Sequence, residues 1–414
     1  MSALSLPRSL ACALASLGAT LMLAGCTTTT VKTVNFDSAE SATEIAEDEL
    51  LDVGIAIFEP NIPDEWEEQE AENILPDVRR AEARYLPQVL KATLEESGNW
   101  GAVRVLPRAS AAVELAVEGS LLESDGEQLK LRIRAVDATG RIWIENDYTY
   151  LTSKYAYETR SPERIDPFQP LYNRIANDLL NIYRSLDRRE RQRIRSIAEM
   201  RFAQTFAPDA FSGYVIEGRR GRWQLERLPA ENDPMLDRIR RVREREYLFI
   251  DTLDEYYLAY RRDMAQPYQD YRRFTYEEAV TLRRLEAESR RRLIAGTVLA
   301  IGGLAATIGS DSPYARNAGA VGLLAGGLAL RSSFEKRAEA RIHMEAIREL
   351  GTSLEGEVTP AVIELDDRTF TLTGTVDEQY ERWRGILREL YADEQGIPLE
   401  ALGEAQDPTE DTRS

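Results

Sequence analysis

Cysteine and histidine are nearly absent from this chain of 414 residues, which has two cysteines and one histidine. The histidine, His343, lies among charged residues in a helical pattern, so we expect it at the surface. Zinc sites and catalytic triads need histidine clustered with cysteine or carboxylates, or placed beside a nucleophile. The sequence therefore predicts no metal site, no cofactor site and no catalytic residue.

Positive charge is also in deficit. The 71 Asp and Glu outnumber the 52 Lys and Arg, which gives a formal charge of −19. Proteins that bind nucleic acid neutralise phosphates with basic residues, so we expect no nucleic-acid partner. A glycine-rich phosphate loop is lacking too, which argues against nucleotide-driven chemistry.

Acidic residues are concentrated near the amino terminus. Residues 33–77 contain fifteen Asp or Glu and no Lys or Arg. Such a block is typical of a solvated tether. Together with the polar opening at residues 27–30, it predicts a linker over residues 26–50.

The first 26 residues have a targeting pattern. Arg8 precedes an apolar run over residues 10–23, which is shorter than the roughly 20 residues that a bilayer span requires. The sequence Leu-Ala-Gly-Cys at residues 23–26 resembles the processing site of a bacterial lipoprotein signal peptide. The resemblance implies that residues 1–25 are removed and that acyl chains on Cys26 attach the protein to membrane lipid.

The same resemblance implies a location. The residue after the cysteine is Thr27 and not the Asp that retains enteric lipoproteins at the inner membrane, which implies lipid anchoring at the periplasmic face of the outer membrane. Processing would also remove Cys12 and leave Cys26 acylated, so the mature chain would have no free thiol.

A strand-and-helix pattern predicts an α/β binding domain over residues 51–160. A buried strand at 53–58 precedes a helix whose apolar face ends before Gly98, since Gly and Asn terminate helices. Further strands are predicted at 102–106, 113–121, 129–136 and 141–150, with Asp and Gly in the turns. We expect an antiparallel or mixed sheet with at least one helix packed on it, in a sandwich-like arrangement.

Three segments of this domain carry a family resemblance. The strand at 53–60, the sequence Ala-Val-Glu-Leu-Ala-Val-Glu-Gly-Ser at 112–120 and the turn Asp-Ala-Thr-Gly-Arg-Ile-Trp at 137–143 resemble TolB N-terminal and CsgG-like periplasmic domains. Proteins with such domains are mostly envelope assembly, secretion or accessory factors that act by binding. The resemblance implies an envelope protein partner and supplies no catalytic residue.

Residues 161–274 are expected to form a helical region. An apolar stripe begins at Leu171 and continues to Leu186, and the arginine-rich run 187–195 is expected to continue the same helix. This run could bind lipid phosphates or an acidic partner, or it could be a solvated face on which Glu190 pairs locally. A loop is expected over 206–234.

A tyrosine-rich helix is predicted over residues 235–264, with its end near Pro267 because proline cannot donate a backbone hydrogen bond. Tyrosines alternate there with arginine pairs such as 261–262 and 272–273. Two interpretations fit this pattern: a surface for a glycan or protein, and ordinary helix packing with guanidinium groups stacked on the rings.

Residues 275–351 are expected to form a helical hairpin with an apolar tip. Thr275 and Glu278 have the spacing of a capping box, and residues 293–309 and 318–330 carry no charge. Small residues at intervals of four, which allow close helix packing, resemble the glycine-zipper hairpins of some envelope lipoproteins: Gly302, Ala306, Ala318, Gly322 and Gly326. The tip could insert into a bilayer, pack in a homo-oligomer, or be covered by helices of its own chain.

The sequence pattern near the carboxyl end predicts a small ββα unit over residues 352–395. Strands at 361–365 and 369–373 precede a helix that contains Trp383, and the order resembles half of a BON-type binding module. Residues 396–414 are expected to be an acidic tail without fixed structure.

The sequence as a whole predicts an α+β protein with three parts: the α/β domain, a long helical region with the apolar hairpin, and the ββα unit. The leading hypothesis is a non-enzymatic, lipid-anchored scaffold, assembly or accessory factor of the envelope. One alternative is a glycan-acting enzyme that uses paired carboxylates, such as Glu67 with Glu68 or Asp366 with Asp367. Another is a carrier of lipid or a small ligand.

Overall fold

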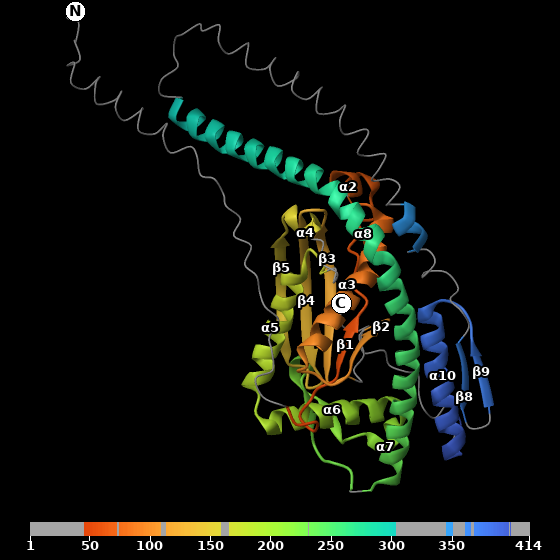
Figure 1. Ribbon diagram of the computed structural model, residues 1–414. Helices are drawn as coiled ribbons and strands as arrows, with labels where there is room; N and C mark the ends of the chain where they lie inside the picture. Colours follow the sequence, from red (N-terminus) through yellow and green to blue (C-terminus); the bar gives the residue numbers. More distant parts are fainter. Residues whose placement is uncertain are drawn as a thin grey trace, which may run out of the picture. The chain divides into compact units, whose positions relative to one another are not determined.

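A mixed five-stranded sheet forms the centre of the protein (Figure 1). The computed structural model describes residues 45–72, 74–108, 113–158, 165–230, 232–303, 345–350, 361–365, 368–396 and 398, with the side chains of 70–71, 285–303 and 364–365 left out. The strand order is β2-β1-β3-β4-β5, with β1 parallel to β2 and β3 and the others antiparallel. The strands are β1 (Val53–Ala56), β2 (Val103–Leu106), β3 (Leu115–Ser124), β4 (Gln128–Asp137) and β5 (Ile142–Leu151).

Alternation along the strands gives the sheet one apolar and one polar face. On β4, Leu129, Leu131 and Ile133 are fully buried. The residues between them face the other way and form ion pairs with neighbouring strands, including Arg132 with Asp147 and Arg134 with Glu118. The apolar face therefore needs a layer of helices, while the polar face is suited to water.

Two helices form that layer (Figure 1). Helix α3 (Pro76–Ser97) joins the parallel strands β1 and β2, and ends at Gly98, whose φ of 65° lies in the left-handed region that glycine favours. Helix α5 (Gln169–Ser185) packs beside it through Leu171, Ile175 and Leu179. The short helices α2 (Trp66–Ala71) and α4 (Tyr155–Glu158) lie in the connections. The mixed sheet and its helices confirm the predicted α+β class.

Helix α6 (Arg188–Phe206) is separate from α5, so the predicted continuous helix was wrong. Leu186 between them is buried and extended, with φ −81° and ψ 139°. The predicted loop over 206–234 contains regular structure as well: α7 (Pro208–Phe211), the strands β6 (Val215–Glu217) and β7 (Trp223–Leu225), and a 3-10 turn, Arg219–Gly221.

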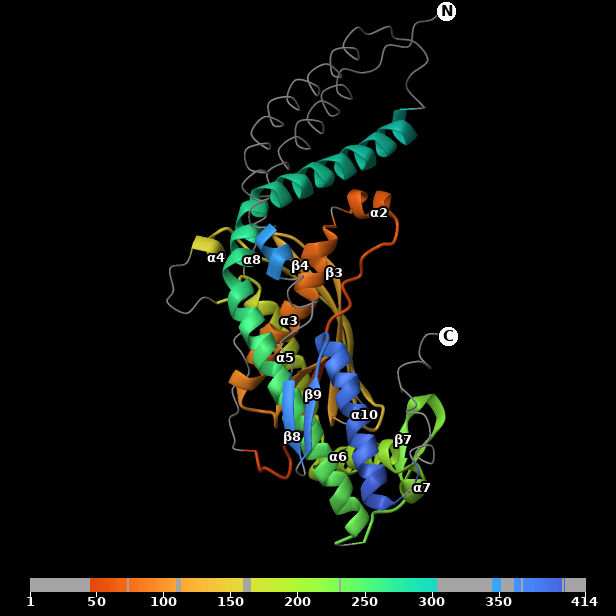
Figure 2. The ribbon, with the colours of Figure 1, turned by 90° about the vertical axis from the view of Figure 1, so that its right-hand side faces the viewer.

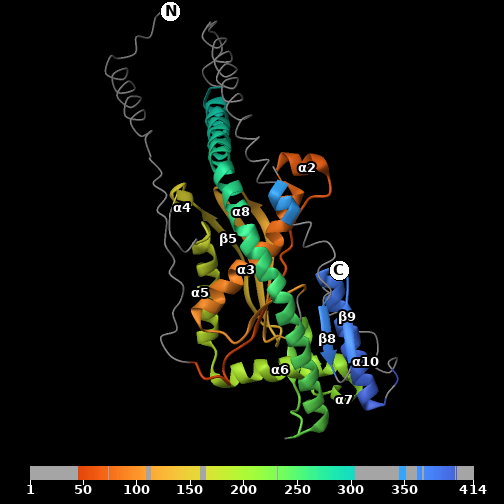
Figure 3. The ribbon, with the colours of Figure 1, turned by 45° about the vertical axis from the view of Figure 1, so that its right-hand side comes forward.

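Helix α8 (Pro234–Gly303) is a single helix of 70 residues (Figure 3). The predicted end near Pro267 was wrong, because Met264 and Tyr268 on either side of the proline are fully buried and hold the helix in place. A proline inside a helix costs about 3 kcal/mol, which this packing offsets. The predicted helix start at Thr275 was also wrong: the Thr275 hydroxyl donates to the Tyr271 carbonyl at 3.0 Å, as in a helix interior.

The ββα unit is present as predicted and packs on α8 (Figure 2). It consists of β8 (Ala361–Leu365), β9 (Arg368–Leu372) and α10 (Val376–Gln395). A capping box formed by Thr375 and Glu378 begins α10. Trp383 lies against Phe249 of α8, with ring centroids 5.5 Å apart. Helix α8 therefore joins this unit to the α/β domain.

Candidate functional site

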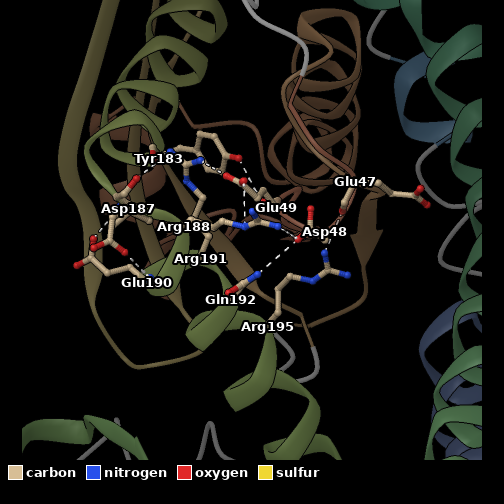
Figure 4. Close-up of polar contacts among 11 residues, drawn as sticks. Glu47, Asp48, Glu49, Tyr183, Asp187, Arg188, Glu190, Arg191, Gln192 and Arg195 are labelled. Carbon is tan, nitrogen blue, oxygen red and sulfur yellow. Dashed lines mark hydrogen bonds and ion pairs between the residues drawn. The ribbon is translucent and has the colours of Figure 1, made fainter.

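Residues 45–50 lead into β1 and lie against the start of α6 (Figure 4). The carboxylates of Asp48 and Glu49 face the arginines of α6. This segment is the end of the acidic block that the sequence predicts to be a solvated tether. Its last part is instead held by the folded domain.

The start of α6 is fixed by a capping box. The Asp187 side chain accepts from the Glu190 amide at 2.8 Å, and the Glu190 side chain accepts from the Asp187 amide at 2.9 Å. Helical periodicity then places Arg188, Arg191 and Arg195 on one face. The arginine run thus becomes a surface that can hold an acidic segment.

Six contacts hold the segment there, and the two longest join Gln192 to Asp48 at 3.4 Å and Arg188 Nε to Glu49 at 3.5 Å. Arg188 Nη2 lies 2.6 Å from Asp48 Oδ2, and Arg191 Nη1 lies 2.6 Å from Glu49 Oε2. Two donors reach backbone carbonyls: Arg195 donates to Glu47 at 3.0 Å, and the Tyr183 hydroxyl donates to Glu49 at 3.2 Å. We call this group the N-terminal clasp: Glu47, Asp48, Glu49, Tyr183, Arg188, Arg191, Gln192 and Arg195.

The charges within the clasp stabilise one another. The hydrogen bond from Arg188 holds the pKa of Asp48 below its usual value of 3.8, and the pKa of Arg188 is raised in turn. The guanidinium of Arg191 also lies 4.4 Å from the ring centroid of Tyr183. The arginine run thus pairs with an acidic segment of its own chain, and its binding of lipid phosphate or of an acidic partner stays a prediction. Local pairing of Glu190 is found as well, in the capping box.

A second set of arginines and tyrosines attaches α8 to the domain. Arg272 is fully buried, and its guanidinium carbon lies 3.9 Å from the ring centroid of Tyr268 and 5.2 Å from that of Phe168. Its Nη2 lies 2.8 Å from Asp166 Oδ2. The packing interpretation of the tyrosine-rich stretch is therefore confirmed for these residues.

Helix α8 is also attached to α3. The Tyr268 hydroxyl donates to Glu82 Oε1 at 2.5 Å, and the Tyr260 hydroxyl donates to the Ala81 carbonyl at 3.0 Å. Lys91 of α3 forms a buried ion pair with Asp254. These contacts hold one face of α8 along the length of α3.

Near β1 and β2, another charged group contacts α8. Arg243 Nη2 lies 3.0 Å from Glu114 Oε1, and Arg104 Nε lies 2.7 Å from Asp251 Oδ1. Burial raises the pKa of Glu114, while the nearby guanidinium of Arg243 opposes that rise. The group joins the start of α8 to the sheet.

Arg283 contacts the far end of the sheet. It forms ion pairs with Asp125 and Glu127 of the β3–β4 turn. The helix continues from there to Gly303, and so enters the uncharged segment that begins at Leu293. The Arg283 contacts fix the point at which α8 leaves the domain.

The other residues expected to matter divide into two groups. Gly302 lies in the last turn of α8, whereas Cys26, Ala306, Ala318, Gly322 and Gly326 lie outside the described residues. His343, Asp366 and Asp367 lie outside them too. Glu67 and Glu68 are exposed neighbours in the first turn of α2.

Sequence reasoning missed two features. The acidic block and the arginine run were each identified, and their opposite charges could have suggested the clasp. The pair of Arg272 with Asp166 had no comparable signal, because the two residues are 106 positions apart and neither belongs to a motif.

The described residues contain no group of three or more His, Cys, Asp or Glu placed to hold a metal ion. No helix within the same ranges is long and apolar enough to cross a membrane. A comparison of the chain with known protein families finds no match, and a comparison with curated proteins finds none either.

Proposed function

We propose that this protein is a lipid-anchored scaffold or accessory factor of the bacterial envelope that acts by binding. The observation that carries the proposal is the continuity of α8. One helix contacts the α/β domain and the ββα unit, and then continues into the uncharged segment that begins at Leu293. A helix that contacts both folded parts and then extends beyond them suits a scaffold.

The positions of the charged contacts support the same proposal. The clasp lies at the end of the sheet that contains the β4–β5 turn, since Arg141 of that turn lies 3.7 Å from Glu190. Helix α8 leaves from the other end, beside the β3–β4 turn. Residues 45–50 and the exit of α8 therefore lie at opposite ends of the sheet.

Acylation is tested first, because the proposal depends on it. The full-length chain is expressed in a diderm bacterium with an alkyne-bearing palmitate analogue, and membranes are separated on a density gradient. We expect the label on the wild type and on Cys12→Ser, the matched control, and no label on Cys26→Ser. Equal labelling of Cys26→Ser would refute the anchor.

The fate of unacylated protein separates the roles of the hairpin. Complete release of Cys26→Ser into the soluble periplasm would exclude bilayer insertion. Crosslinking between copies from a cysteine at Gly322 would then support the oligomer, and recovery of monomer alone would contradict it.

The envelope partner is sought by crosslinking in cells with a tagged, acylated chain. We expect the α/β domain to carry the crosslink, because the resemblance to envelope binding domains covers residues 51–152. Crosslinks confined to lipid would contradict a scaffold role.

A further inference from the structure

The connection between β6 and β7 concentrates positive charge at one exposed point. Its sequence is Gly-Arg-Arg-Gly-Arg at residues 218–222. The side chains of Arg219, Arg220 and Arg222 are exposed, and none forms an ion pair or hydrogen bond with the part of the chain that the structure describes. We call these three residues the loop arginines. They are cations available to a ligand.

One of the loop arginines has an unfavourable backbone conformation. Arg220 has a φ of 63° and a ψ of 38°, in the left-handed region. Glycine fits that region best because it has no Cβ to crowd the following carbonyl, and asparagine is the side chain that tolerates the region most readily. An exposed arginine at a position that favours glycine points to a role for its charge.

The loop is held in place against the sheet. The Trp223 amide donates to the Thr139 carbonyl at 2.8 Å, and the Arg201 guanidinium lies 4.5 Å from the Trp223 ring centroid. Gly140 approaches so closely that an added Cβ would lie 2.0 Å from the Gly221 carbonyl oxygen. The loop arginines therefore project from a fixed base, which lowers the entropy lost on binding.

The same end of the sheet already holds an acidic peptide. Arg201 belongs to α6, and the clasp at the start of that helix binds the carboxylates and backbone carbonyls of residues 47–49. Helix α6 also exposes Arg189 and Arg193, whose side chains contact no acid among the described residues. The loop arginines therefore lie at the end of the sheet where α6 already pairs with an acidic segment of the same chain.

We propose that the loop arginines bind an acidic peptide segment of a partner protein. The guanidinium group binds carboxylates through charge-assisted hydrogen bonds, and the clasp contains two such pairs, Arg188 with Asp48 and Arg191 with Glu49. The inference rests on the proposed scaffold function and deepens it by naming the chemistry of the partner. It also assigns the binding role to one loop of the domain.

Binding is measured with the full-length protein in detergent micelles. The probe is a fluorescein-labelled decapeptide of alternating Glu and Ser, followed by fluorescence anisotropy at low salt, where screening is weak. The test variant carries Arg219→Gln, Arg220→Asn and Arg222→Gln. The control variant removes the same charge elsewhere, through Arg262→Gln, Arg273→Gln and Arg382→Gln.

We expect the test variant to bind the peptide about tenfold more weakly, since three exposed ion pairs are lost. The control should change the affinity by less than about twofold. Unchanged binding by the test variant would overturn the proposal, as would an equal loss in the control, which would indicate only an effect of net charge.

Two further experiments exclude a disrupted turn and a lipid ligand as explanations. Arg220→Asn alone suits the left-handed conformation, so weaker binding by this variant cannot come from a disrupted turn. Vesicles of phosphatidylethanolamine and phosphatidylglycerol are tested with full-length Cys26→Ser protein. If the test variant loses vesicle binding but keeps peptide binding, the loop arginines bind lipid phosphate and not an acidic peptide, and the proposal is wrong.

The outcomes for the anchor and for this surface are separable. Cys26→Ser should bind the decapeptide as the wild type does, because the anchor takes no part in the contact. If acyl labelling fails while peptide binding persists, the location is wrong and the surface stands. If labelling succeeds while the test variant binds normally, the surface is wrong and the anchor stands.

Discussion

Two arginine–carboxylate interfaces hold distant segments onto the α/β domain, and they differ in burial. Arg272 and Asp166 at the α8 interface have side chains that are 0% and 6% exposed. In the clasp, Arg188 and Asp48 are 62% and 52% exposed, whereas Arg191 and Glu49 are 17% and 18% exposed. The ion pair at α8 is therefore buried, while the outer pair of the clasp is open to water.

The difference follows from the surroundings of each charge. A buried guanidinium that loses its partner remains unpaired in an apolar environment, which is costly. An exposed pair is screened by water and salt, so its loss costs little. The α8 interface should therefore govern the stability of the fold, and the clasp should govern only the position of the amino-terminal segment.

The largest effect is expected from Arg272→Met. This change leaves Asp166 buried without its ion-pair partner, and should lower the free energy of unfolding by about 3–5 kcal/mol in urea titrations. Arg273→Met is the control, because Arg273 is the exposed neighbour on the same helix. Equal effects of the two changes would refute the distinction between buried and exposed pairs.

A smaller loss is expected from Gly126→Ala in the β3–β4 turn. An added Cβ would lie 2.2 Å from the Arg272 carbonyl oxygen, so the turn must move away from α8. We expect a loss of about 1–3 kcal/mol in the same titrations. Gly385→Ala in α10 is the control, since no heavy atom lies near its added Cβ and alanine favours helix. A stabilising Gly126→Ala would show that α8 does not approach this turn closely.

The smallest effect is expected from Arg188→Gln in the clasp. The urea midpoint should not change measurably, while limited proteolysis near residue 48 should be roughly two- to threefold faster than in the Arg189→Gln control. Equal rates for the two variants would show that the clasp does not restrain the segment.

The clasp should also depend on pH in one direction. Because the pKa of Asp48 is lower in the folded protein than its usual 3.8, the contact is fully present above that value and is lost as the pH falls through the lowered pKa. Protection from proteolysis should therefore be equal at about pH 7 and pH 5. Loss of protection within that window would contradict the assigned pair.

Much of the fold could be predicted because its signals are local. Alternating apolar residues indicated the strands, Gly98 indicated the end of α3, and the ββα order was read from a short segment. Local rules failed along α8, where packing of Met264 and Tyr268 outweighs the preference of Pro267 to end a helix. The same packing makes the capping pattern at Thr275 irrelevant.

The candidate site was predictable only in its parts. The sequence displayed the acidic block and the arginine run, yet Asp48 and Arg188 are 140 positions apart, and nothing local indicates that they meet. The exposed loop arginines lie within a predicted loop, where the left-handed backbone of Arg220 could not be recognised.

The strands, the helical stripes, the charge blocks and the resemblance to a lipoprotein at Cys26 can all be recognised in the amino-acid sequence. Which charges form pairs, and which of those pairs are buried, depends on the folded structure. The physical reason is that ion pairing depends on distance and dielectric surroundings in space, and neither is set by position along the chain.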